Sequence, residues 1–239
     1  MADALVASKA GDYETALALW TPLAQTGNAR AQNNIGACFL DGLSVARDLA
    51  LAEKWLTLSA QARDPVGQRN LAAFYFNGHG GESDYPRAAT LYRAAAEQGD
   101  APAQDMLSWM LLEGEVMPRD VDEARRWARA AAEQGIAASM TRLGMLYHDA
   151  IGVDRDAAEA ARWWRLGAEA GDTDGQAMLG AAHFLGNGAA KDGVAALTWL
   201  LRAEEGGSKL AKPFLGPVRA SLTPAEIAEA ERHSREPLP

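Results

Sequence analysis

The side chains that could do chemistry are few and scattered along the 239-residue chain. Cys38, the one cysteine, lies in the apolar stretch 34–40, so we expect a buried, unreactive thiol and no disulfide within the chain. None of the histidines has a second ligand at the spacings typical of helical zinc sites; they are His79, His148, His183 and His233. The sequence therefore predicts no metal, no cofactor and no enzyme.

A glycine-rich segment at 78–81 is superficially like a phosphate-binding loop. It lacks the Lys-Ser/Thr pair that follows such loops, and no strand signal precedes it. The chain also lacks the Gly-x-Ser-x-Gly element typical of serine hydrolases. We therefore interpret this segment as a variable connection between helices.

The charge and hydropathy of the chain narrow the class of partner and the compartment. A formal net charge of −9 repels phosphate backbones, so we expect no nucleic-acid partner. No apolar stretch approaches the length of a membrane span. The first residues carry no signal-peptide pattern, which predicts a cytoplasmic protein, or a periplasmic one if a leader precedes them. We favour a monomer.

Residue types recur along the chain every 36 residues without gaps. A large apolar row comprises Ile35, Leu71, Leu107, Leu143, Leu179 and Leu215. A row of small residues follows it at Gly36, Ala72, Ser108, Gly144, Gly180 and Gly216. An aspartate row comprises Asp12, Asp48, Asp84, Asp120, Asp156 and Asp192. A second large row comprises Leu19, Trp55, Leu91, Trp127, Trp163 and Trp199.

These rows predict two helices in each repeat. The apolar and small rows share one face of a first helix, and the small residue lets a neighbouring helix approach closely. The aspartates cap the start of a second helix, and a glycine ends each helix. We expect an all-α fold, a right-handed α-solenoid of antiparallel helix–turn–helix repeats.

We expect one solenoid domain over residues 1–239. A lead-in helix pair covers 1–27, and five full repeats cover 28–63, 64–99, 100–135, 136–171 and 172–207. A partial repeat and a capping helix cover 208–236, and the capping helix begins at a capping box formed by Thr223 and Glu226.

The tryptophan row is expected to be helical core, and His183 takes the aromatic core position of its repeat. Trp20 and Trp164 lie next to this register, so we predict that they are partly exposed. We expect His148 to face a groove.

The recurring motif resembles the Sel-one-like repeat, a relative of the tetratricopeptide repeat. The resemblance rests on the stretches 94–101 and 130–135, and on residues of the fourth repeat: Leu143, Gly144, Tyr147, Gly152, Asp156, Ala160 and Trp163. It covers about residues 10 to 216.

This resemblance implies an interaction module or adaptor that binds a protein or peptide in a concave groove. A bacterial role in signalling, envelope assembly or secretion is implied, for example as an effector-neutralising immunity protein. The implied groove positions are Asn33, Asp41, Arg69, Phe76, Asn77, Asp105, Trp109, Leu112, Glu113, Thr141, Met145, His148, Asp149 and Phe184. Their acidic bias predicts a partner with basic character at the contact.

Two alternatives remain open. One is a protein that binds cell-wall ligands or binds or hydrolyses β-lactams, but the relatives with that activity carry paired cysteines in every repeat. Here only Cys38 is present. The other alternative is a structural spacer or oligomer.

Overall fold

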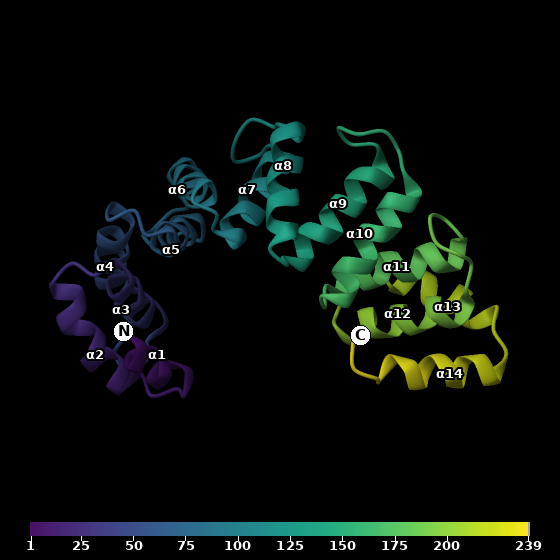
Figure 1. The fold of residues 1–239 in the computed structure, drawn as a ribbon, viewed down its shortest axis with the longest axis horizontal. Coiled ribbons are helices and arrows are strands. Elements are labelled where there is room, and N and C mark those ends of the chain that lie inside the picture. The colour runs from purple at the N-terminus through teal and green to yellow at the C-terminus, as the bar shows by residue number, and fades with distance from the viewer. Residues whose placement is uncertain (239) are drawn as a thin grey trace. The chain divides into compact units, whose positions relative to one another are not determined.

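The computed structural model describes residues 1–238, and every regular element in that range is an α-helix. The chain divides into two compact units, unit 1 (Met1–Arg119) and unit 2 (Asp120–Pro239) (Figure 1). Unit 1 holds α1 (Ala2–Lys9), α2 (Tyr13–Gln25), α3 (Ala29–Asp41), α4 (Leu49–Gln61), α5 (Pro65–Phe76), α6 (Tyr85–Glu97) and α7 (Ala101–Glu113). Unit 2 holds α8 (Val121–Glu133), α9 (Ala137–Asp149), α10 (Ala157–Glu169), α11 (Thr173–Leu185), α12 (Gly193–Glu205), α13 (Lys212–Ala220) and α14 (Pro224–Ser234).

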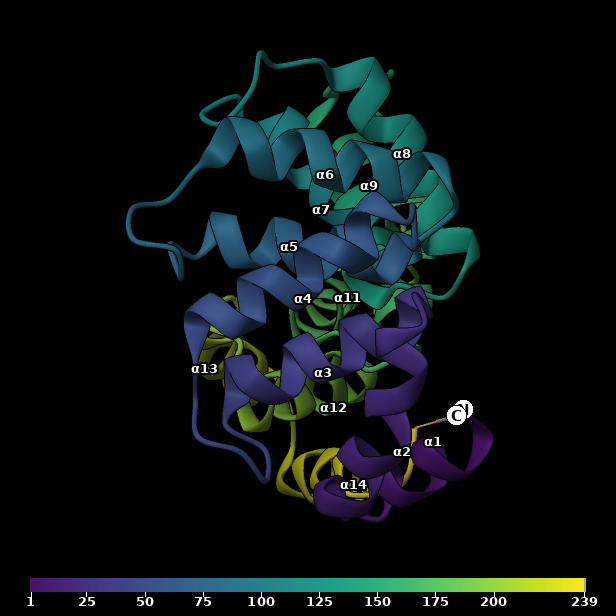
Figure 2. The same ribbon diagram turned by 90° about the vertical axis from the view of Figure 1, so that its left-hand side faces the viewer.

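Both units are built in the same way from helix pairs. In unit 1, α3 packs on α4 and α5 packs on α6, and each second helix also packs on the first helix of the next repeat (Figure 2). In unit 2, α9 packs on α10 and α11 packs on α12. First helices of successive repeats touch as well, α3 with α5 and α9 with α11. The predicted all-α solenoid of helix–turn–helix repeats is confirmed.

The aspartate row caps the second helices as the sequence predicts. All six aspartates accept a hydrogen bond from a backbone N–H in the first turn of the following helix, at α2, α4, α6, α8, α10 and α12. The first helices end in a left-handed residue at Gly42, Gly114, Ala150 and Gly186. These caps satisfy backbone groups that a helix end leaves free.

Buried glutamines in three of the first helices make a further set of hydrogen bonds that the sequence did not predict. The Nε2 amides of Gln32, Gln104 and Gln176 each donate to a carbonyl eight residues earlier, at 3.0, 3.1 and 3.3 Å. Each acceptor belongs to the last turn of the preceding second helix, where carbonyls lack a partner within the helix. Each of these three glutamines therefore joins its own repeat to the second helix before it.

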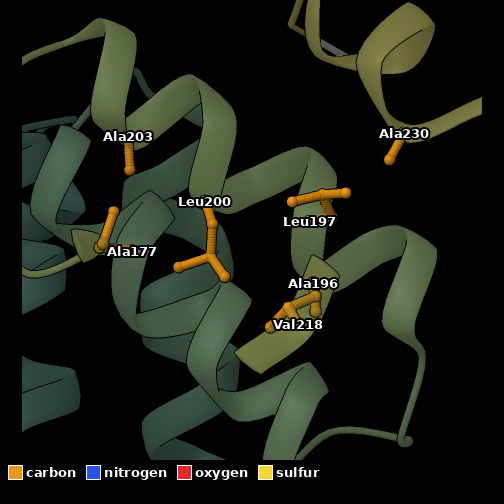
Figure 3. Close-up of a cluster of buried hydrophobic side chains, with 8 residues drawn as sticks. Ala177, Ala196, Leu197, Leu200, Ala203, Val218 and Ala230 are labelled. Carbon is orange, nitrogen blue, oxygen red and sulfur yellow. The ribbon is translucent and has the colours of Figure 1, made fainter. Parts of the chain in front are cut away.

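The core of each unit is rich in alanine and leucine. Figure 3 shows the cluster at the end of unit 2, where α11, α12, α13 and α14 contribute Ala177, Ala196, Leu197, Leu200, Ala203, Val218 and Ala230. The last helix packs on α12 and covers the last full repeat. It begins at the predicted capping box of Thr223 and Glu226.

The prediction for two tryptophans was wrong. Trp20 and Trp164 are only 3% and 2% exposed, because each fills the space between its own helix and a neighbouring helix. Trp164 of α10 lies against Gly144 of α9 so closely that a Cβ at this glycine would overlap the indole ring. The small-row residue Gly144 thus provides room for Trp164, which the repeat register alone did not reveal.

Candidate functional site: the first-helix face

The predicted groove positions lie on the first helices of the repeats. We call the exposed side of these helices the first-helix face: α3, α5 and α7 in unit 1, and α9 and α11 in unit 2. The positions fall into four rows of the 36-residue register, and the rows differ sharply in burial.

The row that contains Asn33, Arg69 and Thr141 connects neighbouring repeats. The side chains of Asn33 and Thr141 are buried, at 3% and 5% exposure. Asn33 Oδ1 accepts from Asn70 Nδ2 at 2.8 Å, and Arg69 Nε lies 3.0 Å from Asp100 Oδ1. We therefore assign these three groove candidates to packing between repeats, since their polar atoms are used within the chain.

Two of these residues contact an aspartate that caps a helix: Arg69 contacts Asp100, and Thr141 donates a hydrogen bond to Asp172. Asp100 accepts from the backbone N–H of Ala103, and Asp172 accepts from that of Gly175. An arginine in α3 repeats the arrangement, because Arg30 Nη2 lies 2.9 Å from Asp64, the cap of α5. Asp105 is half-buried in the same row and is also engaged with other groups.

The other rows place aromatic and apolar side chains at the surface of unit 1. Phe76 on α5 and Trp109 on α7 are half-buried, and their rings meet edge to face with centroids 6.0 Å apart. The ring of Tyr85, at the first turn of α6, lies 5.2 Å from that of Phe76. We name Phe76, Tyr85, Trp109 and Leu112 the aromatic surface; Leu112 is half-buried one turn beyond Trp109 on α7.

Sequence reasoning missed Tyr85, which is 42% exposed. Its position belongs to the second-helix register, where it follows the capping Asp84. A search restricted to first helices could not find it. An aromatic residue directly after a capping aspartate, beside a long glycine-rich turn, was the available signal.

Acidic and polar side chains surround these apolar groups. Asp41, Asn77 and Glu113 are exposed at or just past the carboxyl ends of α3, α5 and α7. The carboxylates add negative charge where the helix dipoles already place partial negative charge. A positively charged partner group would meet a favourable potential here.

Unit 2 carries a smaller group of candidates on α9 and α11. Met145 is 37% exposed, and Asp149 is exposed at the last residue of α9. His148 Nδ1 lies 2.7 Å from Asp149 Oδ1, and the imidazole ring lies 5.4 Å from the ring of Trp164. Phe184 packs against the cluster of α12–α14, whereas Leu185 beside it is 60% exposed.

No nucleophile or metal centre accompanies these surfaces in the described residues. Cys38 is buried as predicted, and burial followed by the nearby charge of Asp41 raises the pKa of its thiol to about 11. His183 is half-buried and uses Nδ1 in a 3.0 Å contact with the carbonyl of Ala190. Within residues 1–238 no three His, Cys, Asp or Glu side chains are grouped to hold a metal ion.

None of the helices up to Ser234 is long and apolar enough to cross a membrane.

Comparison with known proteins identifies the repeat. The family model of the Sel1 repeat matches residues 29–64, 65–100, 101–136, 137–172 and 173–208. These units keep the predicted 36-residue spacing and begin one residue later than the predicted boundaries. No curated protein is significantly similar to the chain.

Solved bacterial structures share the fold. A Sel1 repeat protein from Oxalobacter formigenes is 30% identical with a TM-score of 0.83, and the match covers 98% of each chain. A Sel1 repeat protein described as putative in Klebsiella pneumoniae subsp. pneumoniae is 20% identical with a TM-score of 0.53, over 85% of this chain and 99% of that one. The second likeness shows the fold alone. Repeats of this kind generally mediate protein–protein interactions, and with five matching units this chain belongs to the Sel1 repeat family.

Proposed function

We propose that this protein is a non-catalytic adaptor that binds a protein or peptide partner on its first-helix face, mainly at the aromatic surface of unit 1. The ring contact between Phe76 and Trp109 carries the proposal. It places half-buried aromatic side chains from two successive repeats together at one accessible surface. A few residues supply most of the binding energy in protein interfaces, and tryptophan and tyrosine are enriched among them.

The surroundings of the aromatic surface indicate the chemistry of the partner. Asn77 and Glu113 are exposed at the ends of α5 and α7, one residue after Phe76 and Leu112 respectively. A polar rim around an apolar centre is the usual arrangement of a protein interface. The partner should therefore present an apolar or aromatic anchor with lysine or arginine beside it, because the acidic rim then attracts it and fixes its orientation.

In unit 2 we propose a second contact region formed by Met145, His148, Asp149 and Phe184. Methionine adapts its shape to different apolar partners, and Met145 on α9 is 37% exposed. Asp149 again places a carboxylate at the end of a first helix. The role we infer is that of a bacterial adaptor in signalling, envelope assembly or secretion, which includes neutralisation of an effector protein.

The test is a comparative affinity capture from a bacterial lysate that contains the natural partner. Immobilised wild-type protein is compared with the double variant Trp109→Ala, Glu113→Lys. The matched control is Trp127→Ala, Glu133→Lys on the second helix α8, which removes another half-buried indole and makes the same charge change. Circular dichroism and thermal unfolding confirm that all three proteins are folded before capture.

We expect a stoichiometric partner with wild type and control, and a loss of about tenfold or more with the Trp109 variant. Equal recovery with both variants contradicts the assignment of the aromatic surface. Absence of any stoichiometric partner, together with self-association of the purified chain, contradicts the adaptor role and favours a structural oligomer.

A further inference from the structure

A pocket of about 310 Å³ lies away from the aromatic surface, between the second helices α4 and α6 of unit 1. Its lining comes from Thr57, Ala60 and Gln61 of α4, Leu71 of α5, and Arg87, Thr90 and Leu91 of α6. The three helices pack side by side (Figure 2). None of these residues belongs to the aromatic surface, so the pocket is a separate feature.

The pocket has an apolar floor and an accessible mouth. Ala60 and Leu71 are 8% and 3% exposed, whereas Gln61, Arg87 and Thr90 are exposed at the rim. The Thr90 hydroxyl donates to the carbonyl of Pro86 at 2.9 Å, so it is already engaged within its helix. A volume near 300 Å³ is at the lower end for ligand pockets and suits one ring system.

The repeat register gives the corresponding site in unit 2, two periods further along the chain. The floor residues Ala60 and Leu71 correspond to Ala132 and Leu143, which are the same residue types and are likewise buried. The walls differ. Thr57, Thr90 and Leu91 correspond to three large side chains: Arg129, Arg162 and Trp163.

In unit 2 the Trp163 indole occupies the space between α8 and α10, and the two arginines lie over it at the exposed surface. Arg129 and Arg162 lie over the ring of Trp163, with Cζ atoms 5.8 and 5.6 Å from its centroid. Trp163 is 7% exposed in this position. A guanidinium near an indole face is a favourable cation–π arrangement. Unit 2 therefore supplies from its own chain the indole that the smaller walls of unit 1 leave room for.

The rim of the unit 1 pocket carries an arginine, Arg87, at the position that Glu159 holds in unit 2. Arg87 holds its guanidinium over the ring of Tyr75, with Cζ 4.0 Å from the centroid. This contact keeps the cation at the edge of the pocket. Because a guanidinium has two faces, its other face can stack on a second aromatic ring.

We propose that the α4–α6 pocket binds the side chain of a tryptophan presented by a partner protein, in the way that the chain's own Trp163 is held in unit 2. The open mouth admits a side chain that projects from another protein surface. The apolar floor and the two threonine walls offer no charged group except Arg87, which fits a neutral indole ring. The pocket shares no residue with the aromatic surface, so failure of this proposal would not contradict the proposed function, nor the reverse.

The experiment uses ¹⁹F NMR titrations of the full chain with 5-fluoroindole and with N-acetyl-5-fluorotryptophanamide. We expect saturable binding of both probes with a weak Kd, in the millimolar range typical of small fragments. Leu91→Trp introduces the residue type found at the same register position in four other second helices, at Trp55, Trp127, Trp163 and Trp199. This variant should abolish saturable binding because its own indole fills the pocket. Leu19→Trp changes the same register position on α2 and should leave binding unchanged.

A second variant keeps the test decisive if Leu91→Trp folds poorly. Thr90→Arg introduces the cation found at Arg162, on an exposed position, and should weaken both probes by about tenfold through partial cover of the mouth. No saturable binding to wild type, or binding unchanged in the Leu91 and Thr90 variants, overturns the proposal. Binding of 5-fluoroindole without binding of the amide also overturns it, since the site would then accept only a free aromatic molecule.

Discussion

Thr141 Oγ1 donates a 2.6 Å hydrogen bond to Asp172 Oδ2, the oxygen that also accepts from the backbone N–H of Gly175 at 2.8 Å. One carboxylate thus caps α11 and ties it to α9 of the preceding repeat. At the corresponding position of an earlier repeat, Arg69 forms an ion pair with Asp100, the cap of α7. A position that the family pattern assigns to a binding groove is used here to join repeats.

Replacing Thr141 with valine should destabilise the protein by about 1 kcal/mol, because the half-buried carboxylate of Asp172 loses a donor while the shape of the side chain at 141 is kept. The measurement is urea unfolding followed by circular dichroism. The control is Thr21→Val, at an exposed threonine whose hydroxyl donates to the carbonyl of Leu17 in the same helix. Equal effects of the two substitutions would show that the link between repeats adds nothing to stability.

Gly144→Ala should destabilise the fold by about 1–3 kcal/mol, since the added Cβ overlaps the indole of Trp164 and α9 must move away from α10. Thermal unfolding tests this. Gly216→Ala is the matched control: this glycine lies in α13 with open space around it, and alanine there should be neutral or stabilising by up to about 1 kcal/mol. If Gly144→Ala were as stable as wild type, the close approach of α9 and α10 would be wrong.

Arg202→Ala should loosen the end of α14. The guanidinium donates to the carbonyls of His233, Ser234 and Glu236, at 2.7, 3.2 and 2.9 Å, and also lies over Trp199. We expect faster amide hydrogen exchange in 230–238, because loss of these contacts lets the end of α14 open locally. Exchange in α8–α10 should change little, because the lost hydrogen bonds do not involve these helices. Arg162→Ala, which removes a 64% exposed arginine of α10, should leave the exchange of α14 as in wild type.

The Cys38 thiol should react very slowly with a disulfide reagent in the native protein. Burial raises its pKa to about 11 from the ordinary 9.0, so at about pH 8 the folded chain keeps the thiol protonated and shielded. Unfolding lowers the pKa toward its ordinary value and exposes the sulfur. Rapid native labelling at a rate close to that in denaturing urea would contradict this assignment.

Much of the fold could be predicted from the 36-residue register because caps and close contacts depend on residue type at fixed positions. The six aspartate caps and the glycines after the first helices are examples. It was harder to predict whether each of two adjacent side chains is buried or exposed. Trp163 and Trp164 are both buried, since one faces α8 and the other faces Gly144 of α9.

The candidate site could be predicted only in part. The register placed Phe76, Trp109 and Glu113 on accessible parts of first helices, but it gave Asn33 and Thr141 the same status although both are buried. A side chain at the edge of a helix can turn toward a partner or toward the next repeat, and polarity does not decide which. The α4–α6 pocket depends on how side chains from three helices meet in space, which the register of residue types does not specify.

Amide hydrogen exchange of the purified protein, with and without its captured partner, tests most directly whether the first-helix face of unit 1 binds the partner. A partner bound at the aromatic surface should slow exchange in the segments 69–77 and 105–113, which belong to α5 and α7. Stabilised backbone at a contact exchanges more slowly because local opening becomes rarer. Protection confined to second helices, with these two segments unchanged, would contradict the claim that the first-helix face of unit 1 binds the partner.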